Sequence, residues 1–216
     1  MLPFLFLWLM RFEKKLAIHW KTALLVACGH IVFGWLSSRL MGLIEVGFDV
    51  EKAAKMRLYG SVFVLPLLYY LWAKKTKREI NLVMDFAAIC VILGLFLGRL
   101  NCFKTSCCQG MLIVADGTLR WPIRELEMLF YILFIAIYAG KIQKRKTHGE
   151  VYPIYMIAYG ILRFLCEFVR EEYTTQVGFL HLAHVWSILS IAAGAIWLCL
   201  LNRKRKLIPR KKYTKS

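Results

Sequence analysis

Residues 82–100 read LVMDFAAICVILGLFLGRL, a nearly continuous apolar run that ends in an arginine and a leucine, and this stretch decides the fold. A membrane-spanning helix needs about 20 predominantly apolar residues. Lipid cannot satisfy the hydrogen bonds of an exposed backbone, so an apolar run of this length in a bilayer must be helical. The stretch therefore predicts a transmembrane helix that ends near Leu100.

Similar segments recur along the whole chain. Hydrophobic residues make up 59% of the 216 residues and the mean hydropathy is +0.55, values typical of a membrane protein rather than of a soluble domain. The predicted spans are approximately residues 22–44, 57–73, 82–100, 125–140, 151–169 and 181–201. The fourth span is short and needs snorkelling ends or a thin local bilayer. We therefore expect an all-α, polytopic integral membrane helical bundle with about six transmembrane helices.

The bundle uses most of the chain and leaves no room for a separate soluble domain. The predicted organisation is an N-terminal segment at residues 1–21, a transmembrane bundle at residues 22–201 and a basic cytoplasmic tail at residues 202–216. The first ten residues are apolar but short, and basic residues follow them, whereas a signal peptide has its positive charges first. We expect an interfacial or partly inserted helix here rather than a full span.

The net charge of +17 is concentrated in every second connection. Lys and Arg gather in the four clusters Arg11 to Lys21, Lys74 to Arg78, Lys141 to Lys146 and Arg203 to Lys215. This alternation is the positive-inside pattern, and it also suits anionic lipid headgroups. It predicts that these clusters are cytoplasmic and that the connections near residues 45–56, 101–124 and 170–180 lie outside. No basic motif of the nucleic-acid-binding kind occurs, so we expect no nucleic-acid partner.

Several charged residues converge at the predicted outer side of the membrane. Arg39 lies near the outer end of the first span and Arg99 near the outer end of the third. Arg163, Glu167 and Arg170 follow i, i+4, i+7 spacing and share one face of the fifth span. Ionisable residues within a membrane normally face the bundle interior or a wet cavity.

Arginines at this depth have two physical interpretations. A guanidinium is a rigid fork of donors that matches phosphate oxygens, which predicts a lipid-phosphate site in which Glu167 positions an arginine. The alternative is a self-contained Arg163–Glu167 pair that joins two helices. That alternative leaves Arg39 and Arg99 at the same depth without an explanation.

The motifs around these charges resemble the prolipoprotein diacylglyceryl transferase family. The loop from Gly98-Arg99 to Gly110 matches its signature loop, and Tyr159-Gly160-x-x-Arg163-x-x-x-Glu167-x-x-Arg170 matches its arginine–glutamate helix. The likeness extends to Ser38-Arg39-Leu40, to Pro122 and Glu127, and to the Gly149 turn, and it covers roughly residues 25 to 200.

The resemblance implies a reaction and a set of site residues. A diacylglyceryl group would move from phosphatidylglycerol to the thiol of a cysteine in a secreted lipoprotein precursor, with no metal and no cofactor. The protein would be a multi-pass protein of the bacterial cytoplasmic (inner) membrane with an outward-facing active site. The implied catalytic residues are Arg99, Arg163, Glu167 and Tyr59, and the implied substrate-binding residues are Arg39, Gly98, Cys102, Gly110 and Arg170.

The chain departs from the family pattern at four positions. Tyr59-Gly60-Ser61 stands where the family has His-Gly-Gly, and a tyrosine with an ordinary pKa near 10 is a poorer base than histidine. If Tyr59 cannot accept a proton, His184 is the substitute that we expect. Cys102 stands in place of the family's asparagine and Cys107 in place of its acidic residue, as in a subset of family-like proteins with a Cys-Cys loop.

The thiols of Cys102, Cys107 and Cys108 are open to several interpretations. Disulfides persist outside the cytoplasm, so a Cys102–Cys107 or Cys102–Cys108 bridge would clamp the loop. A thiol near Arg99 and Lys104 would be reactive, because positive charge favours the thiolate. A metal site lacks a fourth ligand at a characteristic spacing.

Two other functions compete with the transferase hypothesis. The first is a thiol-redox membrane protein that uses Cys102 with Cys107 or Cys108. The second is a non-catalytic phospholipid-binding relative, which the missing histidine favours.

Overall fold

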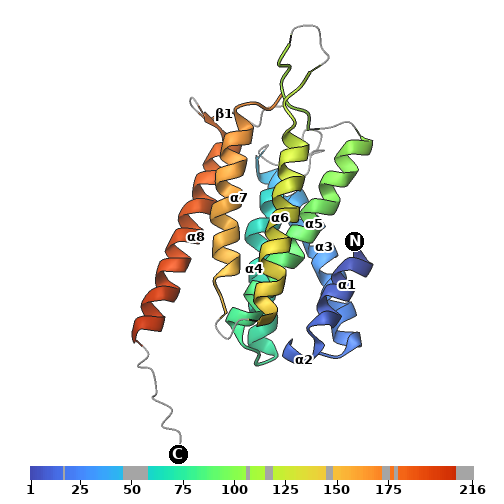
Figure 1. Cartoon of the computed structure of the whole chain (residues 1–216), viewed down its shortest axis with the longest axis vertical. Coiled ribbons are helices and arrows are strands. Elements are labelled where there is room, and N and C mark those ends of the chain that lie inside the picture. The colour runs from blue at the N-terminus through green and yellow to red at the C-terminus, as the bar shows by residue number, and fades with distance from the viewer. Residues whose placement is uncertain are drawn as a thin grey trace, which may run out of the picture.

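The computed structural model describes residues 1–16, 18–45, 58–105, 108–114, 119–144, 148–171, 176–177 and 180–207, and their helices run back and forth along one long axis (Figure 1). The helices are α1 (Leu2–Arg11), α2 (Glu13–Leu16), α3 (Trp20–Glu45), α4 (Leu58–Lys75), α5 (Ile80–Lys104), α6 (Ile123–Lys144), α7 (Val151–Glu167) and α8 (Leu182–Leu207). Two short strands, β1 (Gln176–Val177) and β2 (Leu180–His181), pair antiparallel.

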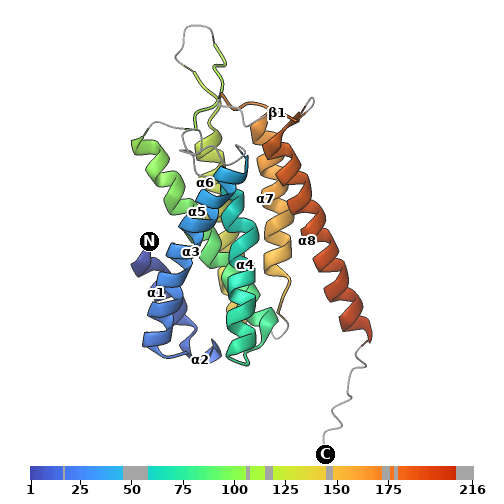
Figure 2. The same cartoon turned by 180° about the vertical axis from the view of Figure 1, so that it is seen from behind.

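The six long helices α3 to α8 correspond to the six predicted spans. Three of them, α3, α5 and α8, are long and apolar enough to cross a membrane by length and composition. The other three lie beside them along the same axis (Figures 1 and 2). The prediction of an all-α membrane bundle is therefore confirmed, and the chain is an integral membrane protein.

Helix α5 forms the centre of the bundle. It contacts α1, α4, α6 and α7, and its residues from Val83 to Ile92 are almost completely buried. The helices α3 and α8, by contrast, leave large apolar side chains such as Leu25, Trp35 and Ile196 exposed. Exposed apolar faces of this extent are typical of helices that contact lipid.

The N-terminal helix α1 packs against the bundle along part of its length. Leu5 and Leu9 are fully buried, and the ring of Trp8 stacks on Phe86 of α5 with 5.3 Å between ring centroids. Figures 1 and 2 show α1 beside the lower half of α3. At 10 residues α1 is too short to span a bilayer, and an interfacial or partly inserted position for it stays a prediction.

The start of α7 is fixed by a buried carboxylate from α5. Asp85 accepts hydrogen bonds from the backbone N–H groups of Gly149 and Val151, both at 2.8 Å, and so satisfies donors at the beginning of the helix. Gly149 has φ +106°, a conformation that L side chains rarely adopt, which explains the glycine at this turn. At the end of α8, Arg205 forms an ion pair with Glu150 and donates to the carbonyl of His148.

Candidate active site

Five charged side chains form one continuous chain of ion pairs at the opposite end of the bundle from Asp85. Arg99 pairs with Glu127, Glu127 also lies 3.8 Å from Arg163, and Arg163 binds Glu167 at 2.7 Å. Arg170 lies 3.8 Å from the same Glu167 oxygen. We call these five residues the arginine–glutamate chain, because the charges alternate along it.

Each member of the arginine–glutamate chain is placed by a helix end. Arg99 lies in the last turns of α5, and Glu127 lies in the second turn of α6. Arg163 and Glu167 are one turn apart at the end of α7, so the i, i+4 spacing puts them side by side. The three helices reach the same end of the molecule (Figure 1), and this brings together residues that are far apart in the sequence.

The arginine–glutamate chain is buried and has an excess of positive charge. The exposed fraction is 3% for Arg99, 5% for Arg163 and 0% for both glutamates. Three guanidinium groups face two carboxylates, so one positive charge is not balanced within the arginine–glutamate chain. Buried charges are costly unless they are paired, and an anionic ligand would balance the remaining charge.

Arg170 lies beyond the end of α7, where a loop holds its backbone. Gly110 forms an antiparallel bridge with Arg170, and Met111 N–H donates to the Val169 carbonyl at 2.8 Å. A Cβ at Gly110 would overlap the Trp121 carbonyl oxygen, so only glycine fits this close approach. Burial lowers the pKa of the Arg170 guanidinium, and Arg163 lowers it further, yet an arginine remains protonated at neutral pH.

Cys108 of the signature loop lies near Arg170, and no disulfide joins it to Cys102. Arg170 Nη2 donates to Cys108 Sγ at 3.1 Å, and Cys108 has a positive φ of 59°. The Cys102 thiol donates to the Gly98 carbonyl at 3.6 Å within α5. Cys107 lies outside the described residues, so a Cys102–Cys107 bridge stays a prediction. Among the described residues, no group of three or more His, Cys, Asp or Glu side chains could hold a metal ion.

Tyr59 lies at the start of α4, in a group of buried tyrosines. Its ring centroid is 5.8 Å from that of Tyr159, which in turn stacks with Tyr131 of α6 at 6.3 Å. The Tyr59 hydroxyl lies 2.6 Å from Ser187 Oγ, and Ser187 donates its own proton to the Ala183 carbonyl at 2.8 Å. When the Ser187 hydroxyl donates to the Ala183 carbonyl, Tyr59 is the donor to Ser187, and in this arrangement it is not a base.

His184 lies near the end of α7 with its ring against two phenylalanines. The ring centroids of Phe164 and Phe168 are 4.9 and 4.6 Å away. His184 Nδ1 accepts the backbone N–H of His181 at 3.2 Å, so a neutral ring carries its proton on Nε2. This Nε2 is buried and has no hydrogen-bond partner within the part of the chain that the structure describes.

The remaining predicted site residues are more peripheral. Arg39 is half-buried on α3, with its guanidinium over the Trp35 ring at 5.7 Å from the centroid. Gly98 is exposed on α5, and a Cβ added there would meet nothing within 4 Å. Neither residue is a member of the arginine–glutamate chain. Arg39 was grouped with these charged residues in the sequence by its predicted depth alone.

No site role was predicted from the sequence for Glu127, Tyr131 or Tyr159. Glu127 appeared only as part of a motif, although the structure makes it the link between Arg99 and Arg163. The available signal was a carboxylate in an otherwise apolar predicted span, since such residues are functional by default. Tyr159 also appeared only as part of a motif, whereas Tyr131 is an aromatic residue in an apolar segment that nothing in the sequence separates from ordinary core residues.

Comparisons with known proteins support one family. The family model described as prolipoprotein diacylglyceryl transferase matches residues 48–200. The chain is 27% identical over 177 residues to a protein of Finegoldia magna, covering 77% of this chain and 68% of the relative. It is 27% identical over 212 residues to one of Ehrlichia ruminantium strain Welgevonden, covering 89% and 80%. A Campylobacter lari protein is 33% identical over 124 residues, covering 54% and 45%. All three relatives are named phosphatidylglycerol–prolipoprotein diacylglyceryl transferase.

Proposed function

This chain belongs to the prolipoprotein diacylglyceryl transferase family, and from that premise we propose that it transfers a diacylglyceryl group from phosphatidylglycerol to a cysteine thiol of a lipoprotein precursor. The observation that carries the proposal is the arginine–glutamate chain with its single excess positive charge. A phosphodiester headgroup has one negative charge, which complements this excess. The substrates are those in the names of the relatives.

In this proposal the arginines bind the phosphate and the glutamates hold the arginines in position. Glu127 holds Arg99 and Arg163 next to each other, and Glu167 does the same for Arg163 and Arg170. Each guanidinium has five N–H donors, so donors remain for phosphate oxygens after the ion pairs are formed. Binding the lipid would then neutralise the buried site, which favours an anionic over a zwitterionic headgroup.

The proposed reaction is a displacement at the glycerol carbon that carries the phosphate ester. The thiolate sulfur forms a C–S bond with this carbon while the C–O bond to phosphate breaks, and the bonding electrons leave with glycerol phosphate. The leaving phosphate gains one negative charge during this step. Buried arginines stabilise that developing charge more than they stabilise the phosphodiester, so they lower the barrier.

The thiol proton needs no dedicated histidine in this proposal. Nearby positive charge favours the thiolate form of a cysteine, and the released proton ends on the phosphate dianion or in water. Tyr59 donates to Ser187, which supports a positioning role. His184 carries its proton on Nε2, so it is suited to donating to an anionic group rather than to accepting the thiol proton.

The reaction would take place at the outer face of a bacterial inner membrane. The ends of α5 and α7 that carry Arg99 and Glu167 are opposite the ends at Lys75, Lys144 and Lys204, where basic residues cluster. Basic segments stay cytoplasmic under the positive-inside rule. The arginine–glutamate chain would therefore meet outer-leaflet lipid and a secreted precursor.

The test is transfer of labelled diacylglyceryl from phosphatidylglycerol to a precursor peptide by the purified protein in detergent. We expect label on the peptide with the native chain and a loss of about 100-fold or more with Arg163→Ala, the scale seen when a charge-stabilising group is removed. Lys144→Ala, an exposed cation at the other end of α6, is the matched control. Full activity in Arg163→Ala would contradict the site.

Phospholipid binding without transfer is a second candidate, favoured by one observation. Tyr59 replaces the family's histidine and donates its proton to Ser187, so no side chain at this position is arranged to accept a proton. This candidate predicts that the native chain retains intact phosphatidylglycerol and labels no peptide. The same transfer assay, followed by extraction and mass analysis of the lipid, separates the two functions.

A further inference from the structure

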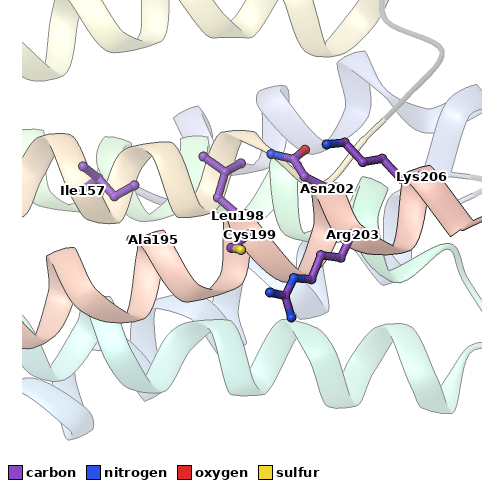
Figure 3. Close-up of a pocket in the computed structure, with 7 residues that line it drawn as sticks. All are labelled: Ile157, Ala195, Leu198, Cys199, Asn202, Arg203 and Lys206. Carbon is purple, nitrogen blue, oxygen red and sulfur yellow. The ribbon is translucent and has the colours of Figure 1, made fainter.

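A groove lies along the end of α8 that is remote from the arginine–glutamate chain. Its volume is about 480 Å³, and it is lined by Ile157 of α7 and by Ala195, Leu198, Asn202, Arg203 and Lys206 of α8 (Figure 3). The α8 residues follow helical spacing, so they form one face of that helix. Neither the proposed reaction nor the family motifs use this face.

The groove has an apolar end and a cationic end. Figure 3 shows Ile157, Ala195 and Leu198 towards one end and the polar ends of Asn202 and Lys206 towards the other. Ala195 and Lys206 are 11 positions apart, which corresponds to about 16 Å along a helix. This length accommodates a headgroup, the glycerol unit and the first part of an acyl chain. The lining contains no carboxylate.

The cations of the groove differ from their neighbour on the same helix. Arg205 is engaged by Glu150 and by the His148 carbonyl, whereas Arg203 and Lys206 make no ion pair within the described residues and are exposed. An arginine and a lysine at the end of a membrane helix each attract anionic lipid headgroups. The acyl chain of a lipid whose headgroup is held by Arg203 and Lys206 would cover the apolar strip beside these residues.

We propose that this groove binds one anionic phospholipid of the leaflet opposite the active site. The phosphate would lie against Lys206 and the side-chain amide of Asn202, with the Arg203 guanidinium at the rim of the groove, and an acyl chain would follow Leu198 and Ala195 against Ile157. The lipid is a bound ligand and not a substrate. The proposal does not depend on transfer activity, because the groove is at the other end of the bundle.

Cys199 is a built-in reporter for the experiment. It is exposed and lines the groove. Cys28 is exposed on α3 and is eight residues from the helix start at Trp20, just as Cys199 is eight residues from the helix end at Leu207. Cys28 therefore lies at a comparable depth, away from the groove, and serves as the internal control.

The measurement is the rate at which N-ethylmaleimide labels each cysteine of the full chain in non-ionic detergent, read by peptide mass spectrometry. Dioleoyl-phosphatidylglycerol should slow labelling of Cys199 and leave that of Cys28 unchanged. Dioleoyl-phosphatidylcholine and soluble glycerol phosphate should protect neither. Protection by glycerol phosphate alone would indicate a phosphate site and overturn the lipid proposal, and equal protection by phosphatidylcholine would overturn the role of the cations.

Three variants define the ligand contacts. Arg203→Gln with Lys206→Gln should raise the half-protecting concentration of phosphatidylglycerol about tenfold or more, because two cations are lost. Lys204→Gln with Lys144→Gln removes the same net charge outside the groove and should leave protection intact. Ala195→Phe fills the apolar end and should also abolish protection. Equal protection in all three variants would overturn the site.

Discussion

At the scale of single residues, Glu127 decides whether the site can exist. It is completely buried, pairs with Arg99 and lies 3.8 Å from Arg163. Without a carboxylate at this point, two guanidinium groups on different helices would repel each other in a medium of low dielectric. The residue therefore couples the stability of the bundle to the arrangement of the arginines in the proposed site.

Replacing Glu127 by Gln should damage both folding and transfer. The substitution keeps the shape of the side chain but leaves Arg99 without its charged partner, and breaking a buried pair in this way costs about 3–5 kcal/mol. Thermal unfolding in detergent and the transfer assay measure the two effects. Glu125→Gln is the control, because Glu125 is exposed on the same helix turn. Its ion pair with Arg124 is long, at 3.9 Å, and therefore weak. Equal behaviour of the two variants would refute the special role of Glu127.

Tyr59→Phe tests whether the tyrosine is a base. The variant keeps the ring in its tilted contact with Tyr159 and removes the hydroxyl that is hydrogen-bonded to Ser187. A lost hydrogen bond of this kind costs about 1 kcal/mol, so we expect transfer to fall by about tenfold at most. Its pH profile should be the same as that of the native chain. A complete loss of transfer with normal lipid binding would show that Tyr59 takes part in proton transfer.

At the scale of elements, the loop from Cys108 to Trp121 acts on the site through the backbone of Arg170. Gly110 bridges Arg170, and Arg120 secures the same region by pairing with Glu171. The loop therefore positions Arg170, the last arginine of the arginine–glutamate chain, through backbone contacts. This gives a physical reason for the glycine at the end of the signature loop.

The two glycines of the signature loop should respond oppositely to alanine. Gly110→Ala would place a Cβ against the Trp121 carbonyl, displace Arg170 and lower transfer by about tenfold or more. Gly98→Ala meets nothing within 4 Å and should raise helix stability by about 0.5–1 kcal/mol. Unfolding temperature and transfer rate report on each variant. A rise in KM for Gly98→Ala would show that the substrate approaches the α5 backbone there.

Sequence patterns predicted the helices better than the contacts between the helices. Apolar length alone predicted the six long helices, and i, i+4 spacing predicted the Arg163–Glu167 pair, because both are local properties of one helix. The contact of Glu127 with Arg99 joins α6 to α5, and such a contact depends on how the helices rotate and cross. Arg39 and Arg99 were grouped by depth for the same reason, since depth is readable in the sequence and rotation is not.

At the scale of the whole molecule, orientation in the membrane determines which substrates the site can meet. A fluorescent protein fused after Leu207 should fold and fluoresce, and alkaline phosphatase fused there should be inactive, because the positive-inside rule predicts a cytoplasmic location for the basic end of α8. A fusion within the loop before Trp121 should show the reverse. Active phosphatase after Leu207 would place the arginine–glutamate chain on the cytoplasmic side and contradict the proposed reaction.

Helix α7 is tied down at both of its ends, by Asp85 at Gly149 and Val151 and by the bridge of Gly110 to Arg170. A rod fixed at two points cannot slide along its axis, so Arg163 and Glu167 keep their height in the membrane. In the proposed reaction the lipid therefore has to reach a site whose depth is set by two fixed points, so the headgroup, and not the helix, makes the approach.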